Sequence, residues 1–399
     1  MRSCQQSRSA GRNLRSGATF LIGVFLAVLL VLLLPAVVSA QDFVTAQEVD
    51  VITSKAKVLS ISTIVKEETN EFEIDDVYSR EIELVEVKVT SGKYRGQTLV
   101  VRREASDESL GKEMEVGDKI VIAIVEEAGY FQSAHITDFQ RDWLIYLLLG
   151  VFVLVLLEVG QVSGVKMLIS LIISLLLIAK VLLPSALRGY DPIFLSFAIA
   201  LFTILITMLL KNDSPEKTWP VVIGSSAGVL LAAVLAFVAT KLIHLTGLSQ
   251  EDIGVLWVLT EGKLNVSSLL VAGVIIGSIG AVLHAAVSIT HAVEVALALD
   301  PFLSVKDLYR EGVRVGRDIA STMSSALIFG LIGLALPLLV HFQASGEHFI
   351  DIINMDVVAG LLVKVLAACV GLMAAIPATA ISAAYFKKKV AKADLIDLT

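Results

Sequence analysis

The chain has 399 residues, 56% of them hydrophobic, a formal net charge of -7 at pH 7 and a mean hydropathy of +0.80. This composition excludes an ordinary soluble domain, and the acidic balance without a separate basic block excludes a nucleic-acid-binding protein. A disulfide framework is also excluded, because Cys4 lies in the leader and Cys369 lies inside a predicted membrane span. The expected environment is therefore a lipid bilayer, with no cofactor and no nucleic acid as partner.

Residues 1–40 have the three parts of a cleaved signal peptide. An apolar stretch runs from Ala18 to Leu34, and Val38-Ser39-Ala40 supplies the small residues that a signal peptidase accepts. An uncleaved anchor helix is the alternative, because the apolar stretch is long. Both interpretations export the segment that follows. The positive region at the start contains Arg2, Arg8, Arg12 and Arg15.

Residues 41–140 predict a small exported antiparallel β-barrel-like domain of OB or SH3-like type. The segment 81–89 alternates apolar and polar residues for much of its length, as a half-buried strand does. Further strands are expected at 51–64, 98–102 and 119–125, separated by turn residues. The acidic stretch 67–76 is interpreted as a solvated insertion, with calcium binding as a weaker alternative.

After residue 140 the chain consists mostly of apolar runs long enough for a helix to cross a bilayer. The pattern predicts a mainly α membrane domain at 141–386 with about seven transmembrane helices, followed by a cytoplasmic basic tail at 387–399. The fifth and last runs exceed one crossing, so they are expected to tilt or to emerge from the membrane. The predicted spans are Trp143–Gly160, Lys166–Leu183, Ile193–Leu210, Trp219–Leu242, Ser267–Leu297, Thr322–Phe342 and Val357–Phe386.

Positive charges gather on one side of the membrane if the loops alternate from an exported first domain. The outer loops keep mainly Arg188, Lys241 and Lys263. This bias matches the positive-inside rule and predicts a multi-pass protein of a bacterial-type plasma (inner) membrane, with the β domain outside and the C-terminus cytoplasmic. The inner side collects Lys166, Lys211, Lys217, Lys306, Arg310, Arg314, Arg317, Lys387, Lys388, Lys389 and Lys392.

The fifth predicted span carries glycines and polar residues on one narrow stripe of a helix. Small residues at this spacing allow another helix to approach, and polar groups inside a membrane need protein or water beside them. Two interpretations stay open: the stripe lines a solute or proton pathway, or it is a helix-packing face. No metal site is expected, because two histidines seven residues apart lie about 10 Å apart along the axis. The stripe consists of Gly273, Gly277, Gly280, His284, Ser288, His291 and, beside its inner end, Glu294.

The charged segment 308–318 is predicted to be an inner loop leading into the next span. Arg317, Asp318 and Thr322 at the membrane boundary are interpreted as a gate or loop anchor. Pro377 follows a run of small residues in the last span and is a hinge candidate, because proline breaks the hydrogen-bond ladder of a helix.

The order of several short motifs resembles the YibE/F family of polytopic membrane proteins. The stretch from Gly273 to Met323 is the most specific part, and the likeness covers most of the chain after residue 80. There are two departures: His284 stands where the family typically has an aspartate, and Ser325 stands where it has an asparagine. The matching pieces are Asp138 to Arg141, Gly160, Gly164, Pro184, Gly189, Lys217-Thr218, Gly224, Leu245-Thr246-Gly247, Gly273 to Ala281, Ser288-Ile289, Glu294, Gly316-Arg317-Asp318-Ile319, Thr322-Met323, Leu336-Pro337, Asn354 and Pro377-Ala378-Thr379-Ala380.

The resemblance implies a multi-span, permease-like protein without naming a substrate. The leading interpretation is a secondary transporter or export-related permease whose pathway follows the helix from Gly273 to Glu294. The alternative is a non-transporting membrane scaffold or sensor whose β domain binds a ligand or partner. An enzyme is not expected, because no GxxxxGK[ST], HExxH or GxSxG motif and no catalytic residue is found. A second membrane subunit or a homo-oligomer is a further expected partner.

Overall fold

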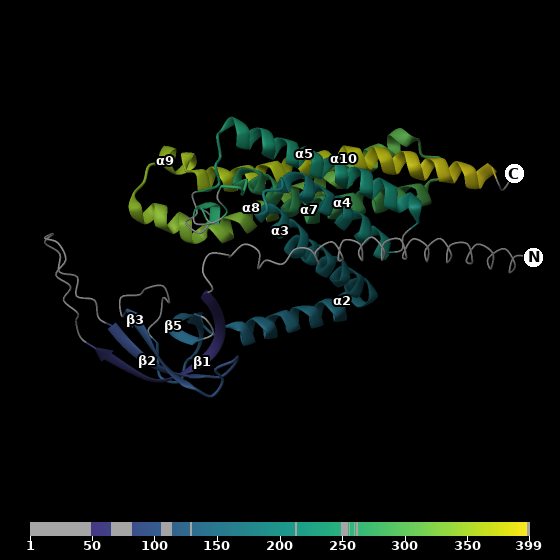
Figure 1. Cartoon of the computed structure of the whole chain (residues 1–399). Helices are drawn as coiled ribbons and strands as arrows, with labels where there is room; N and C mark the ends of the chain where they lie inside the picture. Colours follow the sequence, from purple (N-terminus) through teal and green to yellow (C-terminus); the bar gives the residue numbers. More distant parts are fainter. Residues whose placement is uncertain are drawn as a thin grey trace, which may run out of the picture. The chain divides into compact units, whose positions relative to one another are not determined.

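The computed structural model describes residues 49–64, 82–104, 114–127, 130–211, 214–248, 254, 256–258, 260 and 262–396 (Figure 1). The predicted signal peptide and the acidic stretch 67–76 lie outside the described residues. The chain divides into two compact units, one reaching from Ala40 to Val159 and the other containing Gly160–Thr399. The unit boundary therefore lies inside the first long helix, whereas the sequence places the domain boundary at residues 140 and 141.

The first unit contains a five-stranded antiparallel sheet in the order β3-β2-β1-β4-β5. The two outer strands, β3 and β5, also approach one another, so the sheet curls into a half-barrel. The first four strands confirm the predicted positions, and the fifth was not predicted. The strands are β1 (Val49–Ile64), β2 (Ile82–Val89), β3 (Thr98–Glu104), β4 (Lys119–Glu127) and β5 (Tyr130–Phe139).

Strand alternation builds the core of the half-barrel. Ile120, Ile122 and Ile124 point inward from β4 and are completely buried, because successive side chains of a strand face opposite sides. Glu126 continues this inward row and is also buried. Lys93 Nζ donates to both of its carboxylate oxygens, at 2.8 and 3.0 Å. Hydrogen bonds from Lys93, the larger cause, and from Tyr94 lower the pKa of the Glu126 carboxyl. The lower pKa keeps this buried group charged.

Membrane-length helices make up most of the remaining chain. With α2, η4 and α3 taken together, six segments of the described chain are long and apolar enough to cross a membrane. The protein is therefore a multi-pass membrane protein. The helices are α2 (Asp142–Leu177), the π-helix η4 (Ile178–Leu182), α3 (Leu183–Leu187), α4 (Pro192–Lys211), α5 (Pro215–Leu242), α7 (Val266–Leu299), α8 (Val305–Ser345), α9 (Phe349–Asn354) and α10 (Asp356–Ile396).

The difference between six segments and the seven predicted spans rests on Gln161. This residue has φ 47° and ψ -130°, which no helix accommodates, and it interrupts α2 between the first two predicted spans. The count of seven stays a prediction. Further along, Pro184 explains the wider turns of η4, because its ring displaces the carbonyl four residues earlier, at Lys180.

The prediction of a loop at 308–318 is wrong, because this segment forms the first turns of α8. Ser304 caps the helix by accepting a hydrogen bond from Asp307 N. Small residues at four-residue spacing then bury one face: Gly312, Gly316 and Ala320 lie against α7 and α10. The charged residues between them occupy the opposite face, so an amphipathic helix fits the same composition that suggested a loop.

The core of the helical unit is formed by α5, α7 and α10, and Figure 1 shows α5 and α10 side by side. Small residues permit their close approach: a Cβ placed on Gly224 would lie 1.8 Å from Thr379 Oγ1. A Cβ on Gly228 would lie 2.7 Å from the carbonyl oxygen of Gly371. Only glycine fits at such backbone contacts, so this pair of helices has one well-defined packing.

Candidate functional site

The predicted stripe of α7 lies on the face away from the packed core. A Cβ added to Gly277 or Gly280 would meet no atom of another described element within 4 Å, and both glycines are exposed. Val282 and Ile289, on the opposite face, are completely buried. The stripe from Gly273 to His291 extends for about 27 Å, close to the thickness of the hydrocarbon core.

Polar side chains of the stripe are likewise left outside the core. His284 and His291 are exposed, Ser288 is half-buried, and no hydrogen bond joins either histidine to another helix within the described chain. The Cε of Lys364, in α10, lies 3.9 Å from the Cβ position of Gly273. This lysine is half-buried and makes no ion pair with a described residue, so it adds a basic group to the Gly273 end of the stripe. The sequence analysis missed it, although a lysine that interrupts an apolar run was the available signal.

The end of the stripe at Glu294, which is the inner end in the predicted orientation, carries an ion cluster that joins three helices. Glu294 Oε1, in α7, lies 2.9 Å from Lys217 Nζ in α5 and 3.3 Å from Lys387 Nζ in α10. The Lys387 side chain, at the start of the predicted basic tail, is only 7% exposed and is packed against the helices. Helix α10 continues to Ile396. We call these three residues the inner cluster.

The second carboxylate oxygen of Glu294 is buried without a hydrogen-bond partner in the described part of the chain. His291 Nδ1 lies 3.8 Å from this oxygen, too far for a hydrogen bond. The inner cluster therefore combines two lysines, one carboxylate and one unused acceptor atom. Sequence analysis had placed Glu294 at the site but had treated both lysines only as determinants of topology.

The proposed gate residues are not brought to the inner cluster by any contact that the structure describes. Arg317 and Asp318 are exposed on α8 and form no ion pair with a described residue. Thr322 Oγ1 donates to the carbonyl oxygens of Asp318 and Ile319 in its own helix. Helix α10 continues through Pro377. The gate and hinge roles stay predictions.

A second polar contact joins the turn after α5 to the start of α10, at the end of these helices that is outer in the predicted orientation. Asp356, at the start of α10, accepts hydrogen bonds from Thr246 N at 2.9 Å and from Gly247 N at 2.8 Å. Gly247 has φ +72°, and a Cβ there would lie 2.8 Å from Val266 Cγ1, so glycine is required in this turn. We call this contact the outer clasp. It assigns a structural role to the Leu245-Thr246-Gly247 motif and to Asp356, which sequence analysis had not singled out.

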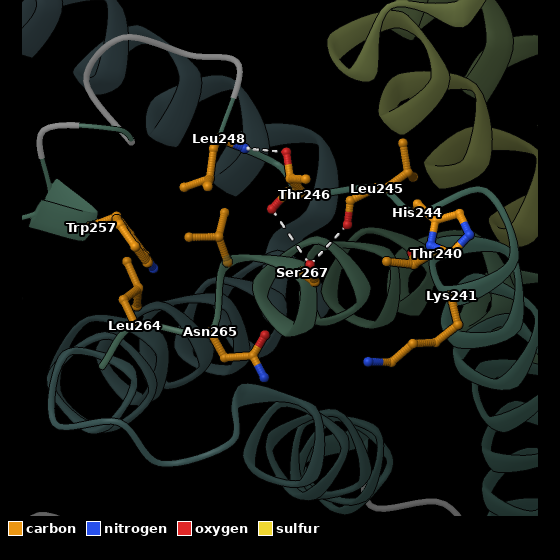
Figure 2. Close-up of a pocket in the computed structure, with 11 residues that line it drawn as sticks. Thr240, Lys241, His244, Leu245, Thr246, Leu248, Trp257, Leu264, Asn265 and Ser267 are labelled. Atoms are coloured by element: carbon orange, nitrogen blue, oxygen red, sulfur yellow. Dashed lines mark hydrogen bonds between the residues drawn. The ribbon is translucent and has the colours of Figure 1, made fainter. Parts of the chain in front are cut away.

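A pocket of about 430 Å³ lies beside the outer clasp (Figure 2). It contains none of the residues predicted for the site. Within the described chain, no group of three or more His, Cys, Asp or Glu side chains has a geometry suited to a metal ion. The pocket is lined by Thr240, Lys241, His244, Leu245, Thr246, Leu248, Trp257, Leu264, Asn265, Val266 and Ser267.

Comparison with known proteins identifies the family to which the chain belongs. The model of the YibE/F-like protein family matches residues 148–389, which is more than half of the chain. The chain therefore belongs to the YibE/F-like protein family. The match starts after the sheet, so the half-barrel lies outside the family region, although the sequence resemblance extended to residue 80. No curated protein and no solved structure matched the chain.

Proposed function

We propose that the protein is a secondary transporter or export-related permease, rather than an enzyme, and that its pathway follows the exposed stripe of α7. The observation that supports this proposal is that the two faces of α7 differ: one is buried in the helical core and the other is exposed. The core face of α7 packs through Val282, Ile289 and Val293, whereas the rest of the described chain leaves the face with His284, His291 and the glycines uncovered. Intramembrane polar groups that packing does not use are a mark of solute and ion pathways.

The packing interpretation is weakened by the same observation. Glycines that serve helix approach are in contact with a neighbour, as Gly224 and Gly228 are, whereas Gly277 and Gly280 have no such neighbour in the described chain. A solute path along this face needs an opposite wall. A second copy of the chain or a second membrane subunit would supply that wall, which agrees with the expectation of an oligomer or partner.

The inner cluster and the outer clasp are positioned to control the two ends of this path. Glu294 joins the inner ends of α5, α7 and α10, and Asp356 joins the α5–α7 connection to the start of α10. Alternating access requires contacts that close one end while the other is open. Breaking each contact separately is therefore expected to change the direction of access and not only the amount of folded protein.

The proposed orientation places the sheet outside a bacterial-type inner membrane and the C-terminus in the cytoplasm. The break at Gln161 supports an odd number of crossings, because each flanking apolar segment is long enough to span. Protease added to intact spheroplasts should then remove the sheet and spare an epitope fused after Thr399. Loss of the epitope with survival of the sheet would contradict this orientation.

Cysteine labelling tests the pathway. In a Cys4→Ser/Cys369→Ala background, Gly280→Cys and Ser288→Cys should react with a membrane-impermeant thiol reagent. Leu334→Cys is the matched control, because this residue is 86% exposed on an apolar membrane helix and should face lipid. Reaction at both stripe positions but not at the control supports a water-lined path.

Protection of all three positions would favour the alternative function, a membrane scaffold or sensor. In that case the glycines of α7 would receive a partner helix or lipid, and the half-barrel would carry the binding function. The observation in favour of this alternative is the close α5–α10 packing, which leaves these two helices no freedom to separate without losing backbone contacts.

A further inference from the structure

The pocket beside the outer clasp has an excess of hydrogen-bond donors. Lys241, near the end of α5, is exposed and makes no ion pair with any residue that the structure describes. Its ammonium group lies 5.9 Å from the centre of the Phe237 ring. Asn265, just before α7, uses its side-chain oxygen to accept from Ser268 N, which leaves its NH₂ group for another partner. Figure 2 shows the Lys241 and Asn265 side chains reaching toward one another.

Two hydroxyl groups beside the pocket, those of Ser267 and Thr246, are already used by the protein. Ser267 Oγ donates to the carbonyl oxygen of Leu245 at 2.8 Å. Thr246 Oγ1 donates to Asp356 and accepts from Leu248 N. Among the lining residues that the structure describes there is no aspartate or glutamate. The Lys241 ammonium and the Asn265 NH₂ group are donors that remain for a ligand, a combination that suits a negatively charged group.

His244 lies directly after α5 and closes the helix with a left-handed turn. It has φ +54°, and Leu245 N donates to the carbonyl oxygen of Thr240, as is usual at the C-terminal end of a helix. This turn places an exposed imidazole, which has a nitrogen donor, at the rim of the pocket.

The opposite side of the pocket is apolar. Leu248, Leu264 and Val266 contribute aliphatic surface, and the indole of Trp257, 41% exposed, completes this wall. Figure 2 shows Trp257 and Leu264 on the side away from Lys241 and His244. The volume of about 430 Å³ falls in the range of small-molecule sites. A ligand that fits both sides carries an anionic head and an apolar tail.

We propose that this pocket binds an amphipathic anion, a carboxylate or phosphate attached to a short hydrocarbon chain. The head contacts Lys241, His244 and the Asn265 amide, and the chain lies against Trp257 and Leu264. No residue of the α7 stripe lines this pocket, so its occupancy can be measured without a transport assay. The anion has two chemical sources, a membrane lipid headgroup or a soluble organic acid.

The fluorescence of Trp257 can report ligand binding to this pocket. The full-length protein with Trp143→Phe and Trp219→Phe, reconstituted in nanodiscs of zwitterionic lipid, has Trp257 as its single tryptophan. Titration with octanoate and with octyl phosphate should give a saturable change in its fluorescence. Octyltrimethylammonium, which has the same tail and the opposite charge, should not. Equal responses to the anions and the cation would overturn the proposal.

Two variants test the head contacts. Lys241→Gln should weaken octanoate binding by about tenfold, the loss of one charged hydrogen bond. His244→Asn should weaken it by less, since asparagine tolerates the left-handed backbone. The control Lys211→Gln removes the same charge on α4, outside the pocket, and should bind as the parent protein does. Unchanged affinity in both pocket variants would overturn the proposal, even if one of them folded poorly.

A second lipid composition separates the sources. In nanodiscs with phosphatidylglycerol, a lipid-occupied pocket should already show the shifted fluorescence and should resist octanoate. A pocket for soluble acids should titrate as it does in zwitterionic lipid. A failure of transport assays would leave these binding results unaffected, so the two proposals fail separately.

Discussion

Helices α5 and α7 both carry glycines at intervals of three or four residues, yet their surroundings differ completely. In α5, Gly224 and Gly228 touch the backbone and small side chains of α10 so closely that an added methyl group would overlap them. In α7, Gly277 and Gly280 have open space around them within the described chain. The same spacing therefore serves a fixed helix contact in one case and an uncovered polar face in the other.

The difference teaches that glycine spacing identifies a surface that another group can approach, but not which group does so. In α5 the approaching group is α10. In α7 the glycines share their face with His284 and His291, and the adjoining Lys364 makes the face basic. Polarity beside the glycines is therefore the feature that separates a candidate pathway from a simple packing contact.

The largest expected effect comes from filling the α5–α10 contact. Gly224→Ala should lower the free energy of unfolding by about 3 kcal/mol, because the new Cβ would lie 2.8 Å from Thr379 Cα and the helices must move apart. Thermal unfolding of the purified protein measures this change. Thr379→Gly in the same chain should recover part of it. A Gly224→Ala protein as stable as the parent would show that the contact is looser than described.

The inner cluster, at the end of the uncovered face, should give the next largest effect. Glu294→Gln leaves the buried Lys387 ammonium without its carboxylate. The expected loss is about 2 kcal/mol, less than for a fully buried pair, since Glu294 is 29% exposed. Glu158→Gln, an exposed membrane-helix carboxylate, is the control. The double variant Glu294→Gln/Lys387→Gln should be more stable than Glu294→Gln alone, and a further loss would contradict this pairing.

The outer clasp should contribute less, because Thr246 is exposed, whereas Lys387 of the inner cluster is buried. Asp356→Asn removes the charge that accepts from Thr246 N and Gly247 N, with an expected loss of about 1 kcal/mol. It should also weaken octanoate binding in the Trp257 assay, since the clasp positions one wall of the pocket. Asp351→Asn in α9 is the control. If octanoate binding and stability both stay at the parent values, the outer clasp does not hold the turn at Thr246 and Gly247 in place.

The smallest effect is expected on the uncovered face itself. Gly277→Ala should change stability by less than about 0.5 kcal/mol, because the new methyl group meets nothing in the described chain. The comparison with Gly224→Ala uses the same unfolding measurement. If Gly277→Ala destabilised the protein as much as Gly224→Ala does, the stripe of α7 would be packed in the assembled protein, and the scaffold interpretation would gain support.

Local patterns determined most of the secondary structure. Alternation in 81–89 predicted β2, because strand faces follow directly from residue order, and the turn residues before 119–125 predicted the start of β4. Long apolar runs predicted the membrane helices, because a bilayer favours uninterrupted apolar segments of this length. The family was also readable from the sequence, since its motifs lie in order along the chain. The helical start of α8 was not, because an amphipathic helix with glycines has the composition of a polar loop.

Only the tertiary structure decided which of these surfaces meet. The sequence contained the glycines of α5 and α7 and the charges of Glu294, Lys217 and Lys387, but it did not pair the lysines with the carboxylate. Nor did it join Asp356 to the turn at Thr246, more than a hundred residues earlier. The reason is physical. Helix and strand formation depend on neighbours along the chain, whereas the partner of a face depends on the summed packing and desolvation of surfaces from distant segments.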